Sequence, residues 1–304
     1  MLQIKKSILF CITSLVLVFS NYATADNQAI PRDILSQLGL PEDKIDIGIA
    51  ALTFAKEFYP NLDVSAYSKQ IDLLVDRAKL LANGTQDPER RIRILNSVLR
   101  DAGYHYDRSP FARSRPEYYF LNGTLDTKQG ICYTMPLLYI AVAQRLGYPI
   151  YPVSAPDHLF VRYADPSFKA QNIEVTSGGK YFTNEDYIQS FSISQAGLAN
   201  GSYLRTMSYK EFLGYMLDAN AFMLSRSGNG QKAINYTELA IQLNPKFADN
   251  YDSLRIAYKA KSEAYKGEAA QEYRNKSEQY ALKAKELGYV DPMTIERGRE
   301  IRGK

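Results

Sequence analysis

The stretch KQGICYTMPLLYIAVAQRLGYP, residues 128–149, decides how the rest of the chain is interpreted. After Gly130 the apolar residues recur with helical spacing, and Gly147 followed by Pro149 is typical of a helix C-terminus. Cys132 therefore opens a buried helix, where unpaired amides and the positive end of the helix dipole stabilise a thiolate. We expect Gly130 to let the chain turn sharply and to leave room for a substrate beside the sulfur.

Two later motifs supply partners for this cysteine. SAPDHLFVRYAD, residues 154–165, places His158 at the entrance of a strand whose alternating apolar and polar residues indicate one buried face. NIEVT, residues 172–176, predicts the next strand, with Glu174 in its middle. The three residues then follow in the order nucleophile, base and orienting acid. His158 would take the thiol proton, and Glu174 would fix the imidazole tautomer and stabilise the imidazolium.

Each of these residues has a structural alternative. Cys132 could be a small buried hydrophobic residue, and His158 could be a structural histidine beside a strand. Glu174 could form a salt bridge with Arg162 or Lys180. The order of the residues and the cysteine at a helix start favour a Cys-His-Glu triad. Because one cysteine and two histidines supply few metal ligands, we predict no metal site and no cofactor.

The N-terminus predicts export. Lys5 and Lys6 precede an apolar stretch of about a dozen residues, and a small-residue triplet at 23–25 follows, a pattern typical of a secretory signal peptide over residues 1–25. A membrane-spanning helix needs about 20 residues, so we expect no stable membrane span after cleavage. Of two cysteines in the sequence, Cys11 would leave with the signal. The remaining thiol then has no internal disulfide partner.

Composition excludes one class of partner. Lys and Arg number 37 and Asp and Glu 33, with both signs alternating along the chain. A nucleic-acid binder usually concentrates basic residues on one surface, so we expect no nucleic-acid partner.

The motifs G-I-C at a helix start, D-H-L-F-V-R on a strand and I-E-V on the next resemble the transglutaminase-like superfamily of papain-type thiol enzymes. Within it, the chain resembles bacterial SirB-type proteins, in which helices, a transglutaminase-like core and a tetratricopeptide tail follow one another. Residues 45–81 and 120–130 resemble that family's opening helices and its lead into the central helix. Many SirB-type relatives are cytoplasmic and lack the cysteine and histidine, so this resemblance also implies non-catalytic members. The active superfamily usually has Asp where this chain has Glu174.

The resemblance also implies an oxyanion site. Papain-type sites combine the cysteine's own amide with a second donor, which here could be Gln129, Asn122 or Tyr133. Gln129 is the first choice because it lies in the turn just before Cys132. A solvent-facing loop glutamine is the alternative.

The C-terminal part has the spacing of a helical repeat. Residues 217–245 carry small and apolar residues at the offsets of a tetratricopeptide unit, and a second, longer unit begins at Tyr251. Two repeats do not form a self-sufficient solenoid, so we expect them to pack on the core. Their groove could bind a protein partner, or the helices could merely complete the fold.

These observations predict an exported α+β protein, periplasmic or secreted. Its predicted segments are a signal peptide at 1–25, a helical N-terminal segment at 26–103, a papain/transglutaminase-like core at 104–205 and a tetratricopeptide-like helical tail at 206–304. The predicted function is cysteine-dependent acyl transfer at an amide of a peptide or protein substrate, most simply peptide or isopeptide hydrolysis. Transglutamination, glutamine deamidation and a non-catalytic binding or scaffold role are the alternatives.

Overall fold

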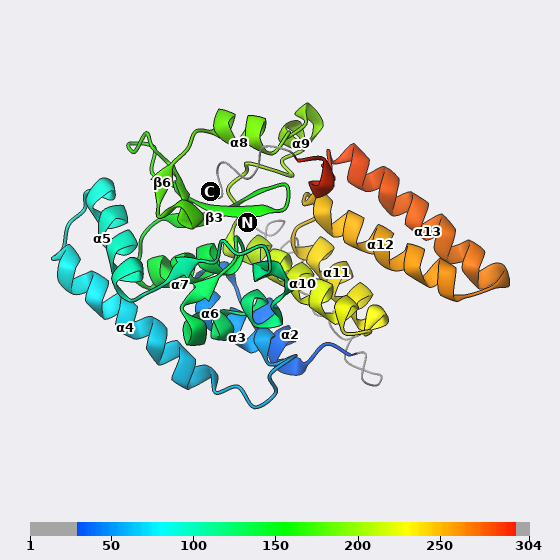
Figure 1. Cartoon of the computed structure of the whole chain (residues 1–304), viewed down its shortest axis with the longest axis horizontal. Helices are drawn as coiled ribbons and strands as arrows, with labels where there is room; N and C mark the ends of the chain where they lie inside the picture. The colour runs from blue at the N-terminus through cyan, green and yellow to red at the C-terminus, as the bar shows by residue number, and fades with distance from the viewer. Residues whose placement is uncertain (1–28, 296–304) are drawn as a thin grey trace, which may run out of the picture.

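The computed structural model describes residues 29–295 as an α+β arrangement of helices around two small β-sheets (Figure 1). This confirms the predicted fold class. The predicted signal peptide at residues 1–25 lies outside the described residues. Within the described part, no helix is long and apolar enough to cross a membrane.

The elements fall into three groups along the chain. The first is helical and comprises α2 (Arg32–Gly39), η2 (Glu42–Lys44), α3 (Ile47–Ala55), α4 (Val64–Ala82) and α5 (Pro88–Asp101). The middle group is mixed and comprises β1 (His105–Tyr106), η3 (Ala112–Ser114), η4 (Pro116–Tyr119), α6 (Leu121–Thr127), β2 (Gln129–Gly130), α7 (Thr134–Arg145), β3 (Ile150–Ala155), β4 (His158–Tyr163), β5 (Asn172–Glu174), η5 (Val175–Ser177), β6 (Lys180–Tyr181), α8 (Asn184–Ser190) and α9 (Gln195–Ala199). The last is helical again and comprises α10 (Tyr209–Arg226), α11 (Gly230–Leu243), α12 (Ala248–Ala264), α13 (Gly267–Glu286) and η6 (Pro292–Thr294).

Helix α7 is the central element. Every residue from Thr134 to Ala143 is buried, and Pro136 lies in the first turn, where its missing N–H leaves no intrahelical bond unmade. Gly147 follows the helix with a φ of 69°, a left-handed conformation that favours glycine. At the last residue, the Arg145 guanidinium binds carboxylates at the start of α3 and on α4. The cysteine-bearing helix is thus tied to the N-terminal helices.

The larger sheet has the antiparallel order β3-β4-β5-β6 and is covered on both faces. Leu159 and Val161 of β4 join the core that contains α7, whereas Phe160 joins a second core with Phe191 of the α8 segment and Phe247 before α12. The expectation of one buried face on β4 was therefore wrong. The second face of the strand is covered by residues from other parts of the chain, such as Phe191 and Phe247. The order of apolar and polar residues within one strand cannot predict that these residues pack there.

Strand β5 ends at Glu174, two residues earlier than predicted. The Oε1 atom of Glu174 accepts a hydrogen bond of 3.0 Å from the Thr176 amide and so closes the 3-10 turn η5. Glu174 therefore lies at the end of the strand and not in its middle. Its side chain accepts the hydrogen bond of the Thr176 amide, which a longer strand would use to pair with a neighbouring strand.

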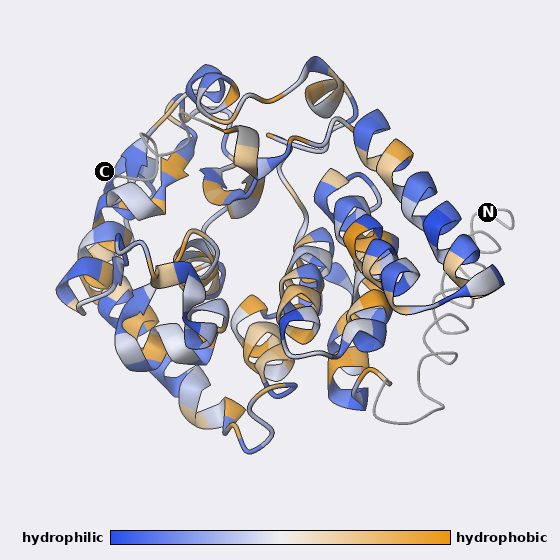
Figure 2. Ribbon diagram, turned by 45° about the vertical axis from the view of Figure 1, so that its right-hand side comes forward, coloured by the Kyte–Doolittle hydropathy of each residue, from blue (hydrophilic) through white to orange (hydrophobic). Residues whose placement is uncertain are grey.

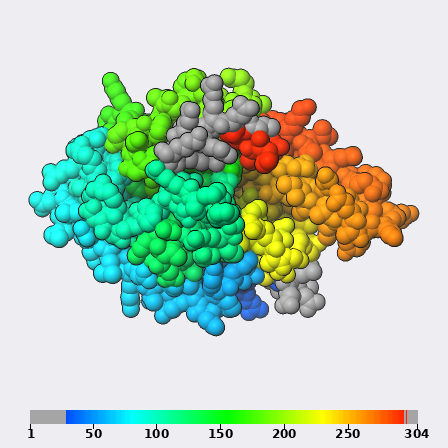
Figure 3. Space-filling view, in the orientation of Figure 1, coloured from blue at the N-terminus to red at the C-terminus, as the bar shows by residue number. Residues whose placement is uncertain are grey.

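The C-terminal helices pack on the rest of the chain. The main hydrophobic core extends from Ile30, just before α2, to Leu243 of α11, across all three groups of elements. Glu57, beyond the end of α3, accepts bonds of 2.6 Å from both Lys232 and Tyr236 of α11. In the space-filling view, the yellow and orange helices lie directly against the green and blue parts of the molecule (Figure 3). Hydrophobic colour concentrates on the inward sides of the helices (Figure 2).

The segment that leads into Cys132 depends on a close backbone approach. A Cβ at Gly123 of α6 would lie 2.0 Å from the carbonyl oxygen of Glu117 in η4. Gly123→Ala is therefore expected to lower the free energy of unfolding by about 1–3 kcal/mol, measured by urea denaturation. Gly39→Ala is the matched control, because nothing lies within 4 Å of the added Cβ at that position. Equal effects of the two substitutions would contradict this packing of α6 on η4.

Candidate active site

The Cys132 thiol lies just before the first residue of α7 and is 5% exposed. The first amides of a helix have no intrahelical partners, so they favour negative charge near this position. Gly130 does not leave room for a substrate, contrary to expectation. A Cβ there would lie 2.7 Å from Thr134 Oγ1 and 3.1 Å from Met135 Cγ, so the space is filled by the start of α7 itself.

His158 is the first residue of β4 and is fully buried. Its Nε2 atom lies 2.7 Å from Glu174 Oε2, and its ring stacks on Phe191 with centroids 4.9 Å apart. These two contacts fix both the tilt and the rotation of the imidazole. The second ring nitrogen, Nδ1, is buried and makes no hydrogen bond of ordinary geometry within residues 29–295. His158 nevertheless lies close enough to Cys132 for each residue to shift the pKa of the other.

Glu174 is fully buried, and both of its carboxylate oxygens accept hydrogen bonds. Oε2 binds His158 and, at 3.0 Å, the Tyr187 hydroxyl, while Oε1 accepts from the amide and, at 2.6 Å, the hydroxyl of Thr176. The alternative of a structural salt bridge is not observed, since among the described residues no Lys or Arg pairs with Glu174. Arg162 instead donates to Asn172 Oδ1 at 2.7 Å.

Arg113, in η3, is a site residue that the sequence did not reveal. Its Nη2 atom lies 3.1 Å from Cys132 Sγ, and its Nη1 atom lies 2.5 Å from Asp157 Oδ2. Asp157 follows Pro156 in the turn between β3 and β4 and has a φ of 52°. Pro-Asp suits such a turn, with proline first and the left-handed residue second. The Pro-Asp pair before His158 was the available signal, but nothing in the sequence around Arg113 connects it to the thiol.

The charges around the thiol and the imidazole favour an ion pair. Burial alone raises the pKa of Cys132, but the Arg113 guanidinium and the neighbouring His158 outweigh it and lower the pKa to about 7. Burial lowers the pKa of His158, but the Glu174 carboxylate and the Cys132 thiol outweigh that effect and raise it to about 9. Between these two pH values the thiolate and the imidazolium coexist.

The structure does not bring Gln129 to the thiol. Its Oε1 accepts a hydrogen bond from the Tyr118 hydroxyl, and its Nε2 lies 3.1 Å from His105 Nε2. Both polar atoms of the Gln129 side chain therefore contact residues of η4 and β1, because the parallel pairing of β2 with β1 directs the side chain toward them. Asn122 is buried with Oδ1 unpartnered in the described part of the chain, whereas Tyr133 lines the cavity that contains Cys132.

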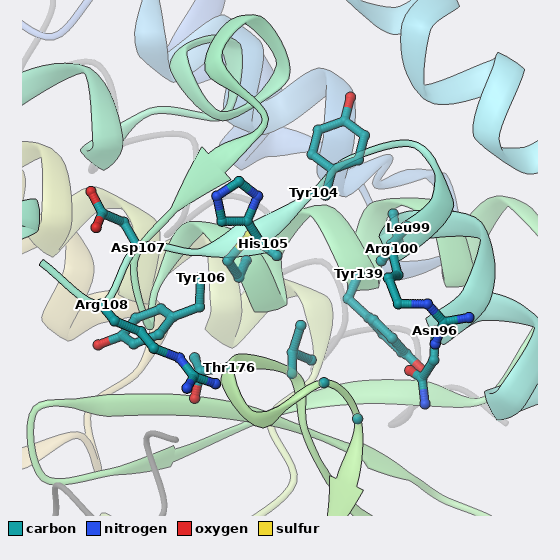
Figure 4. A pocket seen from close by; sticks show the side chains of 14 residues that line it. Asn96, Leu99, Arg100, Tyr104, His105, Tyr106, Asp107, Arg108, Tyr139 and Thr176 are labelled. Carbon is teal, nitrogen blue, oxygen red and sulfur yellow. The ribbon is translucent and has the colours of Figure 1, made fainter. Parts of the chain in front are cut away.

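Cys132 opens into a cavity of about 400 Å³ between the middle group of elements and the C-terminal helices. Its walls carry charged and aromatic side chains, among them Arg113, Tyr133, Asp157, Asp218, Phe222 and Asp249. A second cavity of about 570 Å³ lies on the side of η5 and β1, where His105, Tyr104 and Tyr139 surround it (Figure 4). No group of three or more His, Cys, Asp or Glu side chains in residues 29–295 is arranged to hold a metal ion.

Comparison with known proteins gives matches of different extent. The sequence pattern described as transglutaminase-like superfamily matches residues 65–218, just over half of the chain. F-box only protein 21 from Mus musculus is 36% identical over 78 residues, which is 24% of this chain and 12% of that protein. A UPF0162 protein from Xylella fastidiosa is 25% identical over 146 residues, 48% of this chain and 46% of that protein. The chain therefore spans less than half the length of these curated relatives.

A crystal structure of menin, described as revealing its binding site for Mixed Lineage Leukemia protein, is similar over 90% of this chain and 69% of that chain. The TM-score is 0.44 and the sequence identity 15%.

The contact between Arg113 and Cys132 predicts the reactivity of the thiol. The rate of iodoacetamide labelling should rise with pH through an inflection at about 7, since only the thiolate reacts. Arg113→Gln should move that inflection upward by about one unit, the size expected for losing one charge-assisted hydrogen bond. Arg113→Lys should restore part of the shift.

Arg108→Gln is the control, because Arg108 is exposed and lines the second cavity. An inflection that stays in place in Arg113→Gln would show that the guanidinium does not stabilise the thiolate.

Proposed function

The chain belongs to the transglutaminase-like superfamily, and from that premise we propose that it is a cysteine-dependent acyl-transfer enzyme that acts on amides. The superfamily is typically enzymatic but includes non-catalytic members. The observation that carries the proposal is the fully buried His158–Glu174 pair beside a thiol of lowered pKa. A structural cysteine needs neither a charged partner nor an imidazole fixed from two sides.

In the first step, the Cys132 thiolate attacks the carbonyl carbon of the substrate amide. A carbon–sulfur bond forms, and the carbonyl oxygen takes the negative charge. The backbone amides that precede and begin α7 are the available oxyanion donors, because helix N-terminal amides lack intrahelical partners. His158 then gives its Nδ1 proton to the leaving nitrogen, the carbon–nitrogen bond breaks, and a thioester remains on Cys132.

In the second step, neutral His158 takes a proton from water at Nδ1, and the hydroxide oxygen attacks the thioester. The carbon–sulfur bond breaks, a carboxylic acid leaves, and the thiolate and imidazolium are restored. Glu174 keeps its charge throughout and holds the proton on Nε2, so that Nδ1 is the nitrogen that exchanges. We propose peptide or isopeptide hydrolysis as this simplest outcome.

Other acceptors lead to other products from the same thioester. An amine in place of water gives transamidation, and release of ammonia from a glutamine side chain followed by water gives deamidation. All three share the first step, so the test must detect the thioester before it identifies the product.

The proposed setting is outside the cytoplasm, in the periplasm or as a secreted protein. The support is the signal-like sequence of residues 1–25, after whose removal Cys132 is the one thiol in the chain. We propose residues 104–205 as the catalytic segment and a peptide or protein as the substrate.

A peptide library of blocked amides, analysed by intact-protein and product mass spectrometry, tests the proposal. The wild type should form a thioester at Cys132 and release a cleaved, deamidated or amine-linked product, whereas Cys132→Ala should form none. His158→Gln should lower the rate of acylation by about 10²–10⁴-fold, the usual contribution of a general acid–base. Glu174→Gln should lower it by at least about tenfold, because the tautomer and charge of His158 depend on it.

Glu185→Gln is the control, because Glu185 is an exposed carboxylate on α8. If the thiol is reactive but no thioester forms with any amide in the library, the non-catalytic alternative stands. A rate that is equal in wild type and His158→Gln would contradict the assigned role of the imidazole.

A further inference from the structure

The cavity at Cys132 has one wall that the proposed chemistry does not use. On the core side lie Arg113, Cys132 and Asp157, which belong to the thiolate site. The opposite wall comes from the C-terminal helices, with Asp218 on α10 and Asp249 on α12. Both walls line the same space of about 400 Å³ that a substrate would enter to reach the thiol.

Asp218 has unused hydrogen-bonding capacity in this wall. Its Oδ2 atom accepts a bond of 3.3 Å from Ser253 of α12, and the Thr237 hydroxyl on α11 lies close enough to lower the pKa of the carboxyl, but its Oδ1 atom is buried and makes no hydrogen bond of ordinary geometry within the described residues. An unpartnered buried carboxylate oxygen is destabilising, and a positive charge bound in the cavity beside this carboxylate would offset part of that penalty.

Asp249 is the second carboxylate on this wall of the cavity. Asp249 Oδ2 accepts a hydrogen bond of 2.7 Å from Tyr203, and Asp249 lines the cavity. Burial raises the pKa of Asp218 to about 6 and that of Asp249 to about 8, and the charge of Asp218 contributes to the latter. Mutual repulsion of this kind is relieved when a cation enters.

No basic side chain in the described part of the chain is paired with these two carboxylates. Within residues 29–295, the acidic neighbour Asp252 pairs with Arg255, but no Lys or Arg forms a salt bridge with Asp218 or Asp249. Of the two arginines in the cavity, Arg113 is bound to the thiol and Asp157, and Arg226 lies over the ring of Phe222 at the exposed end of α10.

Aromatic rings line the space between the two walls. Tyr119 and Phe222 lie 5.4 Å apart, and Tyr215 and Phe247 lie 5.1 Å apart, measured between ring centroids. All four rings line the cavity. Aromatic faces attract cations and also pack against aliphatic chains. Together with the carboxylates they match a long apolar side chain with a positive tip, the chemistry of lysine or arginine.

We propose that Asp218 and Asp249 are specificity-determining residues that select peptide substrates with a cationic side chain near the attacked carbonyl. This inference rests on the proposed function, because it assumes that the substrate enters the cavity to reach Cys132. The C-terminal helices then supply the recognition wall of the site, and the core supplies its chemistry.

Binding to the Cys132→Ala protein tests this inference separately from catalysis. The probes are two blocked tripeptides that differ only in a central lysine or norleucine, and calorimetry measures their affinities. The lysine peptide should bind at least about tenfold more tightly, and Asp218→Asn or Asp249→Asn should reduce that preference to less than about threefold. Asp76→Asn is the control, because Asp76 is an exposed carboxylate on α4.

Equal affinities for the two peptides, or a lysine preference that survives in both Asn variants, would overturn the inference. If amides are cleaved at Cys132 without regard to charge, the proposed function stands and this inference fails. If the lysine peptide binds selectively but no thioester ever forms, the inference about recognition stands and the proposed function fails.

Discussion

The buried hydrogen bond between His158 Nε2 and Glu174 Oε2 is the constraint on which the rest of the structure depends. A fully buried carboxylate is tolerated only when other groups replace its water, and Thr176 and Tyr187 complete that replacement. Strand β5 ends at Glu174, and η5 and α8 follow, so that these donors reach it. Within residues 29–295 the Nδ1 atom of His158 accepts or donates no hydrogen bond of ordinary geometry and is available to the thiol, and that asymmetry between the two ring nitrogens is what acid–base chemistry needs.

The rest of the fold holds the thiol against this pair. Helix α7 is buried over most of its length, and Arg145 at its end ties it to the N-terminal helices. The turn between β3 and β4 positions Asp157, which in turn orients Arg113 toward the sulfur. The C-terminal helices close the far side of the cavity with a wall of a different chemical character. Each of the three groups of elements therefore contributes to one site, which agrees with the main hydrophobic core that extends across all three.

Local patterns in the sequence predicted the parts of this arrangement that local physics determines. The helix after Gly130, its end at Gly147 and the strand that begins at His158 follow from periodicity and from glycine and proline positions. The approach of Glu174 to His158 could be predicted from their order on neighbouring strands. Arg113, Asp218 and Asp249 could not, because each reaches the cavity from an element whose packing is set by tertiary contacts. The direction of the Gln129 side chain could not be predicted for a similar reason, since the pairing of β2 with β1 turns it toward Tyr118 and His105.

The proposed chemistry depends on an ion pair between the thiol and the imidazole near neutral pH. The most direct test is an NMR titration of the side-chain nitrogens of His158, which is straightforward to assign because the sequence has two histidines. His158 should be protonated on both nitrogens at pH 8 and should lose a proton at about 9. A neutral imidazole at pH 7 that titrates at or below the ordinary histidine value would contradict this ion pair.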